Sequence, residues 1–201
     1  MVQRVFVEKR EGLAFEASNL LAELTQFAGL EGLRSVRVIN RYDVEGLSPA
    51  EFEAAIPTVF SEPPLDTVSR ELKLPEDACA FALEYLPGQF DQRADSAAQC
   101  LQMQTLGDKP LVRTARVFVL QGNLSPEDVD KAKGYLLNPV ESREAGFDLP
   151  DSLKMAAFEP ELPPVLNGFR EMDEQGMKDL RESQALAMEE DDLLVMVAYF
   201  Q

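Results

Sequence analysis

The sequence contains no histidine, and this absence excludes several classes of catalytic site. Without an imidazole the chain cannot build Ser-His-Asp or Cys-His catalysis, and it lacks the commonest general acid/base and metal ligand. If the chain belongs to an enzyme, we therefore expect the chemistry to lie elsewhere in that enzyme.

Basic residues are also scarce. There are 19 Lys and Arg against 36 Asp and Glu, which gives a formal net charge of −17. Proteins bind nucleic acids and anionic membrane surfaces largely through cationic side chains. The charge therefore argues against both partners, and against an RNA-binding domain of similar topology, which would need aromatic strand residues in basic surroundings.

The chain has only two cysteines and no long hydrophobic run. Cys79 and Cys100 have no spacing typical of a disulfide framework or a zinc site, and we expect both to be small core residues. No apolar run reaches the roughly 20 residues that span a bilayer. The first ten residues lack the layout of a signal peptide. These features predict a reduced, cytoplasmic protein without a metal site.

What the sequence does contain is an internal repeat. Residues 117–145 have a diverged copy in residues 36–72: in both, an alternating apolar segment leads to Leu-Ser-Pro, a helical pattern, and then Pro, Ser and Arg-Glu. The anchors of the repeat are Ser48 with Ser125 (77 apart), Pro64 with Pro139 (75 apart), and Val5–Glu8 with Phe81–Glu84 (76 apart). Repeats of this length predict two copies of one small α/β unit, packed as a pseudo-symmetric pair.

The periodicity of apolar residues predicts the order β-α-β-α-β in each copy. The expected fold class is α+β: two tandem β-α-β-α-β repeats that form a pseudo-dimer, with their helices on one side of the sheets, followed by a helical linker segment. The expected boundaries are 1–77 and 78–147 for the repeats, 148–167 for a Pro-rich linker, and 168–201 for the start of a truncated helical domain.

Several local signals predict where these elements bend or end. Asn40 interrupts the apolar face of a strand, so we expect that strand to bend or split there. Pro57 is expected to kink or stop the helix that contains it. Helix starts are predicted from capping boxes at Ser48 and Ser125, from Asp91 or Asp95, and from the acidic run Glu189–Asp192.

Four longer motifs carry a family resemblance. They are NRYDVEG at 40–46, PTVFSEPP at 57–64, LPGQFDQRADS at 86–96 and NPVESRE at 138–144. With these motifs the chain resembles the N-terminal portion of the phosphoribosylformylglycinamidine synthase family, the glutamine-dependent amidotransferases of purine biosynthesis. The tail at 186–200 resembles the helical linker that follows in that family.

The resemblance implies a fold and a role. The two repeats would be fused copies of the small accessory subunit found in the split form of the enzyme. The full enzyme is a ligase that takes ammonia from glutamine and, with ATP and magnesium, converts the amide of formylglycinamide ribonucleotide to an amidine. Its catalytic, ATP-binding and metal-binding residues would follow Gln201, so none is assigned here and the fragment alone is expected to be inactive.

The implied role is a non-catalytic scaffold that bridges the glutaminase and synthetase domains of the same polypeptide around the ammonia path. An isolated fragment could dimerise through surface meant for those domains. The candidate inter-domain contacts are Arg41, Tyr42, Gln89 and Arg93. Exposed polar residues next to a glycine, such as Gln89 and Arg93, often serve recognition, and Arg41 and Tyr42 lie late in a strand where they could dock a partner. Arg41 and Asp43, two residues apart, are expected to form an ion pair on a solvated sheet face.

An alternative function is a stand-alone regulatory domain that binds a small molecule at a repeat interface. Paired β-α-β-α-β units occur in such domains. A glycine-rich phosphate-binding loop would favour this interpretation, and none is visible in the sequence.

Overall fold

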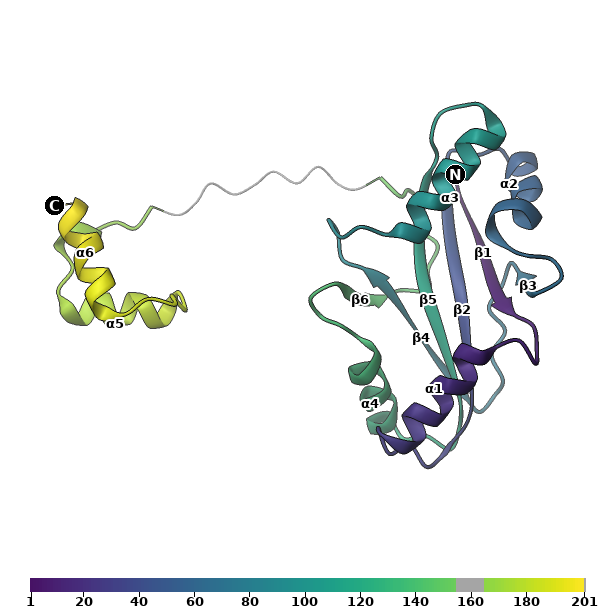
Figure 1. Ribbon diagram of the computed structural model, residues 1–201, viewed down its shortest axis with the longest axis horizontal. Helices are drawn as coiled ribbons and strands as arrows, with labels where there is room; N and C mark the ends of the chain where they lie inside the picture. Colours follow the sequence, from purple (N-terminus) through teal and green to yellow (C-terminus); the bar gives the residue numbers. More distant parts are fainter. Residues whose placement is uncertain (155–164, 201) are drawn as a thin grey trace. The chain divides into compact units, whose positions relative to one another are not determined.

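The computed structural model describes residues 1–154 and 165–200, and the chain divides into two compact units, Met1–Met155 and Ala156–Gln201 (Figure 1). The predicted linker therefore lies partly outside the described residues. The elements of the first unit are β1 (Val2–Lys9), α1 (Phe15–Gln26), β2 (Leu33–Glu45), α2 (Pro49–Ala55), η1 (Ile56–Phe60), β3 (Asp66–Ser69), β4 (Ala78–Tyr85), α3 (Gln92–Thr105), β5 (Leu111–Gly122), α4 (Pro126–Leu136) and β6 (Ser142–Ala145). The second unit contains η2 (Phe169–Glu171), α5 (Glu174–Ser183) and α6 (Glu190–Phe200).

The first unit is built on one six-stranded antiparallel sheet with strand order β3-β1-β2-β5-β4-β6. The long strands β2 and β5 pair at its centre, from Leu33↔Gly122 to Glu45↔Leu111. The mixed α+β class and the predicted β-α-β-α-β order of each half are confirmed.

The strand pairings of the two halves are related by one constant shift along the chain, the shift that takes Val2 to Ala78. We call this shift the repeat offset. It converts the pair Val2↔Glu45 into Ala78↔Gln121, and the pair Phe6↔Ser69 into Ala82↔Ala145. In the central pair of strands, Asn40 lies opposite Arg116. The repeat offset also converts Asn40 into Arg116, so these two equivalent residues face each other. The outer strands of both halves therefore pair in the same register, on either side of this central position.

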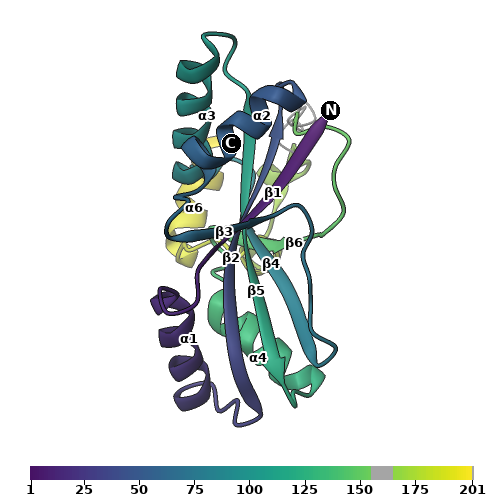
Figure 2. The same cartoon turned by 90° about the vertical axis from the view of Figure 1, so that its right-hand side faces the viewer.

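Helices α1 to α4 pack against one face of the sheet, with α1 and α4 at one end and α2 and α3 at the other (Figures 1 and 2). Leu24 of α1 and Ala132 of α4 are completely buried in one apolar cluster. Phe52 of α2 and Leu101 of α3 are completely buried in another. Strand alternation sends the intervening residues to the opposite face, where Ile39 and other side chains form a third cluster.

The local chemistry of the helix starts is largely as predicted. Ser48 and Ser125 each accept a hydrogen bond from the backbone N–H three residues later, and the carboxylate of that later residue accepts one from the serine backbone N–H, so both capping boxes are confirmed. Asp91, rather than Asp95, caps α3. The predicted stop near Pro57 is also confirmed, because α2 ends at Ala55 and a π-helical turn follows.

Two local predictions are wrong. The split predicted at Asn40 is absent, because that residue is paired with β1 on one side and with β5 on the other. Cys100 is exposed rather than buried, because α3 turns Ala97 and Leu101 toward the core. Cys79 is half-buried, and burial raises the pKa of its thiol.

The second unit is a small helical assembly. Met177, Leu193 and Val197 form its buried cluster, and the ring of Phe169 lies 6.1 Å from that of Phe200. The Asp192 carboxylate accepts a hydrogen bond from the Glu189 N–H, which confirms that the acidic run begins a helix. Among the described helices, none combines the length and the apolar character needed to cross a bilayer.

Candidate functional site

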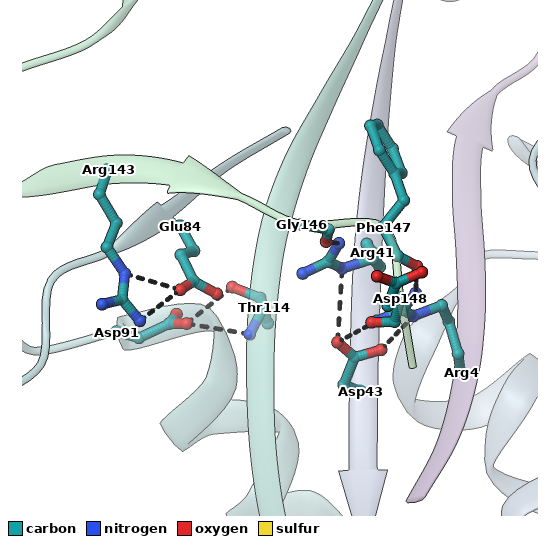
Figure 3. A network of polar contacts seen from close by, with 10 residues as sticks. All are labelled: Arg4, Arg41, Asp43, Glu84, Asp91, Thr114, Arg143, Gly146, Phe147 and Asp148. Carbon is teal, nitrogen blue, oxygen red and sulfur yellow. Dashed lines mark hydrogen bonds and ion pairs between the residues drawn. The ribbon is translucent and has the colours of Figure 1, made fainter. Parts of the chain in front are cut away.

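A buried polar cluster lies on the sheet face opposite the helices, formed by Arg4 of β1 with Arg41 and Asp43 of β2 (Figure 3). We call these three residues the arginine–aspartate cluster. Arg4 binds the carboxylate of Asp43 with two nitrogens, Nε to Oδ1 at 2.5 Å and Nη2 to Oδ2 at 2.9 Å. The Nε of Arg41 lies 3.4 Å from Oδ2. Such paired contacts fix both the position and the orientation of a guanidinium group.

The cluster is almost completely removed from solvent. Arg41 is 3% exposed and Asp43 is 1% exposed, so the predicted solvated ion pair is wrong. Alternation along β2 does place both residues on one face, but that face is covered. Burial lowers the pKa of Arg41, because desolvation penalises its charge, while Asp43 opposes and Arg4 adds to the shift.

The two arginines hold the chain where it leaves the sheet after β6. Arg41 Nη1 donates to the Gly146 carbonyl at 2.7 Å. Arg4 donates to the carbonyls of Phe147 and Asp148, the latter at 3.2 Å. Figure 3 shows the guanidinium groups between the Asp43 carboxylate and these carbonyls. We call residues 146–154 the exit segment, and the cluster fixes its first three residues.

A second contact holds the other end of the exit segment. Glu45, at the end of β2, accepts hydrogen bonds from the Leu153 N–H at 2.6 Å and from the Ser152 hydroxyl at 2.9 Å. These two donors, the Leu153 N–H first, lower the pKa of Glu45. The Leu153 side chain is buried. The first residues of the predicted linker are therefore bound to the sheet.

The second half of the sheet has apolar residues at the corresponding positions. The repeat offset converts Arg4, Arg41 and Asp43 into Ala80, Val117 and Val119. Val117 and Val119 belong to a buried apolar cluster, against which Ala80 and Leu72, in the connection after β3, both pack. The same offset relates Leu72 to Asp148, so an apolar side chain in one half corresponds to a hydrogen-bonded carbonyl in the other.

A cleft of about 590 Å³ lies on the helix-bearing face, lined by residues from both halves of the sheet. We call it the helix-side cleft. Its polar lining includes Glu16, Tyr42, Arg93, Ser96, Thr114 and Arg116. Arg93 of α3 donates to the Tyr42 hydroxyl at 3.3 Å, and Arg116 forms an ion pair with Glu16 of α1. Thr114 donates to the Asp91 carboxylate at 2.7 Å, which joins the strand to the helix cap (Figure 3).

The structure brings together only two of the four predicted contact residues. Tyr42 and Arg93 meet in the helix-side cleft, whereas Arg41 points to the opposite face because it neighbours Tyr42 on a strand. Gln89 lies in the loop before α3 and donates to the Val140 carbonyl at 3.4 Å.

Sequence reasoning missed Arg4 as a partner of Asp43, and it missed the ion pair between Arg116 and Glu16. A signal for the first was present. Once the two copies are aligned by the repeat offset, Arg4, Arg41 and Asp43 stand where the second copy has small or branched apolar residues. Charged residues at buried strand positions point to one another or to buried backbone groups.

Within residues 1–154 and 165–200 there is no group of three or more acidic, cysteine or histidine side chains that could hold a metal ion. No known family model matches the chain, and no curated protein matches it either.

Proposed function

We propose that the first unit is a scaffold made of two copies of one β-α-β-α-β unit, joined as a pseudo-dimer through β2 and β5. The constancy of the repeat offset between the outer strand pairings supports this proposal. The position of Asn40 opposite Arg116 supports it too, because a two-fold axis places equivalent residues opposite each other at its centre.

The proposed parent is a phosphoribosylformylglycinamidine synthase, with this chain as its N-terminal region and the start of its linker. In that setting the chain is a non-catalytic part of a cytoplasmic ligase of purine biosynthesis. Glutamine, ATP and magnesium are used by the glutaminase and synthetase domains, and the scaffold bridges these domains around the ammonia path. The sequence motifs at 40–46, 57–64, 86–96 and 138–144 support this parentage.

The observation that carries the scaffold role is the hold of the arginine–aspartate cluster on the exit segment. Its charged groups contact one another and three backbone carbonyls, which are groups without reactivity of their own. Burying two guanidinium groups and a carboxylate has a large desolvation cost. What the arrangement gains is a fixed direction for the polypeptide that leaves the sheet, which suits a part that positions other domains.

The test is reconstitution. The 201-residue chain is mixed with the separately produced remainder of the gene's product, and glutamine-dependent formation of the amidine from formylglycinamide ribonucleotide is measured. We expect activity only in the mixture, and binding of the two parts in a pull-down. Turnover by the chain alone, or full activity of the remainder without it, would overturn the proposal.

Arg41→Leu and Arg34→Gln make a matched pair of variants for this assay. Arg34 forms an exposed ion pair with Asp77 and does not contact the exit segment. We expect the Arg34 variant to reconstitute activity like the natural chain. The Arg41 variant should bind the remainder but support less amidine formation, because the direction of the exit segment is no longer fixed.

A further inference from the structure

The helix-side cleft differs in charge from the protein that surrounds it. The chain carries a formal net charge of −17, yet two arginines and one glutamate line the cleft. Arg93 and Arg116 therefore create a local positive region in an acidic protein. The volume of about 590 Å³ falls within the range of pockets that bind small molecules.

Most N–H donors of the Arg93 guanidinium group have no hydrogen-bond acceptor within the described residues. A guanidinium group carries five N–H donors, and the contact of Arg93 within the described residues is one hydrogen bond from Nη1 to the Tyr42 hydroxyl. That bond orients the group without neutralising it. The remaining donors are available to an oxyanion, which guanidinium binds with two parallel hydrogen bonds.

The ion-pair partner of Arg116 within the described residues is an exposed glutamate. Its ion pair with Glu16 joins side chains that are 46% and 65% exposed. Exposed ion pairs contribute little free energy, so a ligand oxyanion can replace the glutamate at small cost. The guanidinium carbon of Arg116 also lies 5.1 Å from the centre of the Phe118 ring, a contact that does not depend on Glu16.

The rest of the lining suits an organic body attached to the anion. Val59 and Ala97 contribute apolar surface, and Tyr85 contributes a half-exposed ring. We propose that the helix-side cleft is a binding site for a small organic anion, a phosphate ester or carboxylate whose charged group lies between Arg93 and Arg116. This site is independent of the scaffold role, because the arginine–aspartate cluster lies on the other face of the sheet.

The test uses three probes with the full chain: phenyl phosphate, inorganic phosphate, and phenol as the uncharged counterpart. Binding is followed by NMR, through the Nε–Hε signals of the arginines and the backbone amides of Ser96 and Cys100. We expect phenyl phosphate to shift the Arg93 signal and the α3 amides, inorganic phosphate to bind more weakly at the same place, and phenol to leave the Arg93 signal unchanged.

Substitutions in the cleft should change the affinity for phenyl phosphate in defined directions and by defined amounts. Arg93→Gln should weaken phenyl phosphate binding by about tenfold or more, since charge-assisted hydrogen bonds are lost. Glu16→Gln should strengthen binding about two- to fivefold, because it frees Arg116 from its competing carboxylate. Arg34→Gln and Glu53→Gln are controls of the same chemistry at exposed ion pairs outside the cleft, and they should leave the affinity unchanged.

Three results would overturn the proposal. One is equal binding of phenol and phenyl phosphate. Another is unchanged affinity in Arg93→Gln, or weaker rather than stronger binding in Glu16→Gln. The third is the absence of shifts at Ser96 and Cys100 with every probe, which would leave the cleft to a protein partner. Because these exposed residues do not lie in the core, the variants should fold, and urea denaturation checks this directly.

Discussion

The two halves of the sheet bury the same face by different means. In the first half, Arg4, Arg41 and Asp43 fill it with charge and hydrogen bonds, whereas small and branched apolar residues fill the corresponding part of the second half. In the second half the face is buried by apolar packing alone, and the side chain of Leu72 packs against it. The charged solution costs desolvation, but it provides donors that bind a specific stretch of backbone. Apolar packing is therefore enough to bury this face of the sheet, whereas the charged residues are needed to bind the exit segment.

The largest effect should come from removing one member of the cluster. Asp43→Ala leaves two guanidinium groups buried beside each other without a carboxylate, so we expect a loss of about 3–5 kcal/mol in the free energy of unfolding. The matched change in the other half, Val119→Ala, should cost clearly less, because it removes only apolar contacts. Urea denaturation of both variants measures the difference. Equal losses would mean that the charges of the cluster contribute no special stability.

A further test replaces the three residues of the arginine–aspartate cluster with the residues at the corresponding positions of the second half. The triple variant Arg4→Ala, Arg41→Val, Asp43→Val should be as stable as the natural chain or more stable by about 1–4 kcal/mol, since packed apolar residues often outdo buried ion pairs. Its exit segment should nevertheless be cleaved faster by a protease at residues 146–148, because the carbonyls there lose their guanidinium donors. If that segment stayed protected, packing rather than the arginines would be holding it.

The capping boxes of α2 and α4 should contribute similar amounts to the free energy of unfolding in the two halves. Ser48→Ala and Ser125→Ala each remove one side of a capping box, and each should cost about 1 kcal/mol in the free energy of unfolding. Thermal or urea denaturation gives both values. Values that differ by more than about 1 kcal/mol would show that the two capping boxes do not contribute equally to stability.

The smallest effect concerns pH at the far end of the exit segment. The folded pKa of Glu45 lies below its ordinary value of 4.5, so its contribution is fully present above pH 4.5 and is lost as the pH falls through the lower, folded value. The hydrogen-exchange protection factor of the Leu153 amide should fall in that acid range.

Glu45→Gln is the control for this pH dependence. Its amide oxygen can still accept a hydrogen bond, but it does not titrate, so protection of Leu153 should then be weak and independent of acid pH. A protection factor that falls equally in this variant would assign the effect to another carboxylate.

The sequence predicted features that depend on near neighbours along the chain. The capping boxes at Ser48 and Ser125 and the end of α2 near Pro57 are local, so a few residues decide them. The element order follows from periodicity and was also predicted. Arg41 shows the limit: alternation placed it beside Asp43, but its burial depends on Gly146, 105 residues later. Such a distant contact leaves no pattern within a single strand.

The helix-side cleft was less predictable still. Tyr42 and Arg93 were both selected as polar contact residues, but only the pairing of β2 with β5 and the packing of α3 bring them together. Arg116 gave no local signal, since a charged residue in a strand usually marks a solvated face. Its position opposite Asn40, at the centre of the sheet, comes from the strand register.

The hold on the exit segment also determines how the first unit would respond to mechanical tension on the chain beyond it. The last strand, β6, has four residues and pairs with β4 at the edge of the sheet, an arrangement in which a pull opens hydrogen bonds one at a time. Arg4 and Arg41 are bonded to the chain just after Ala145, so they would transfer the force to β1 and β2. The many backbone hydrogen bonds of these longer strands would share it. The edge strand is thereby shielded from peeling.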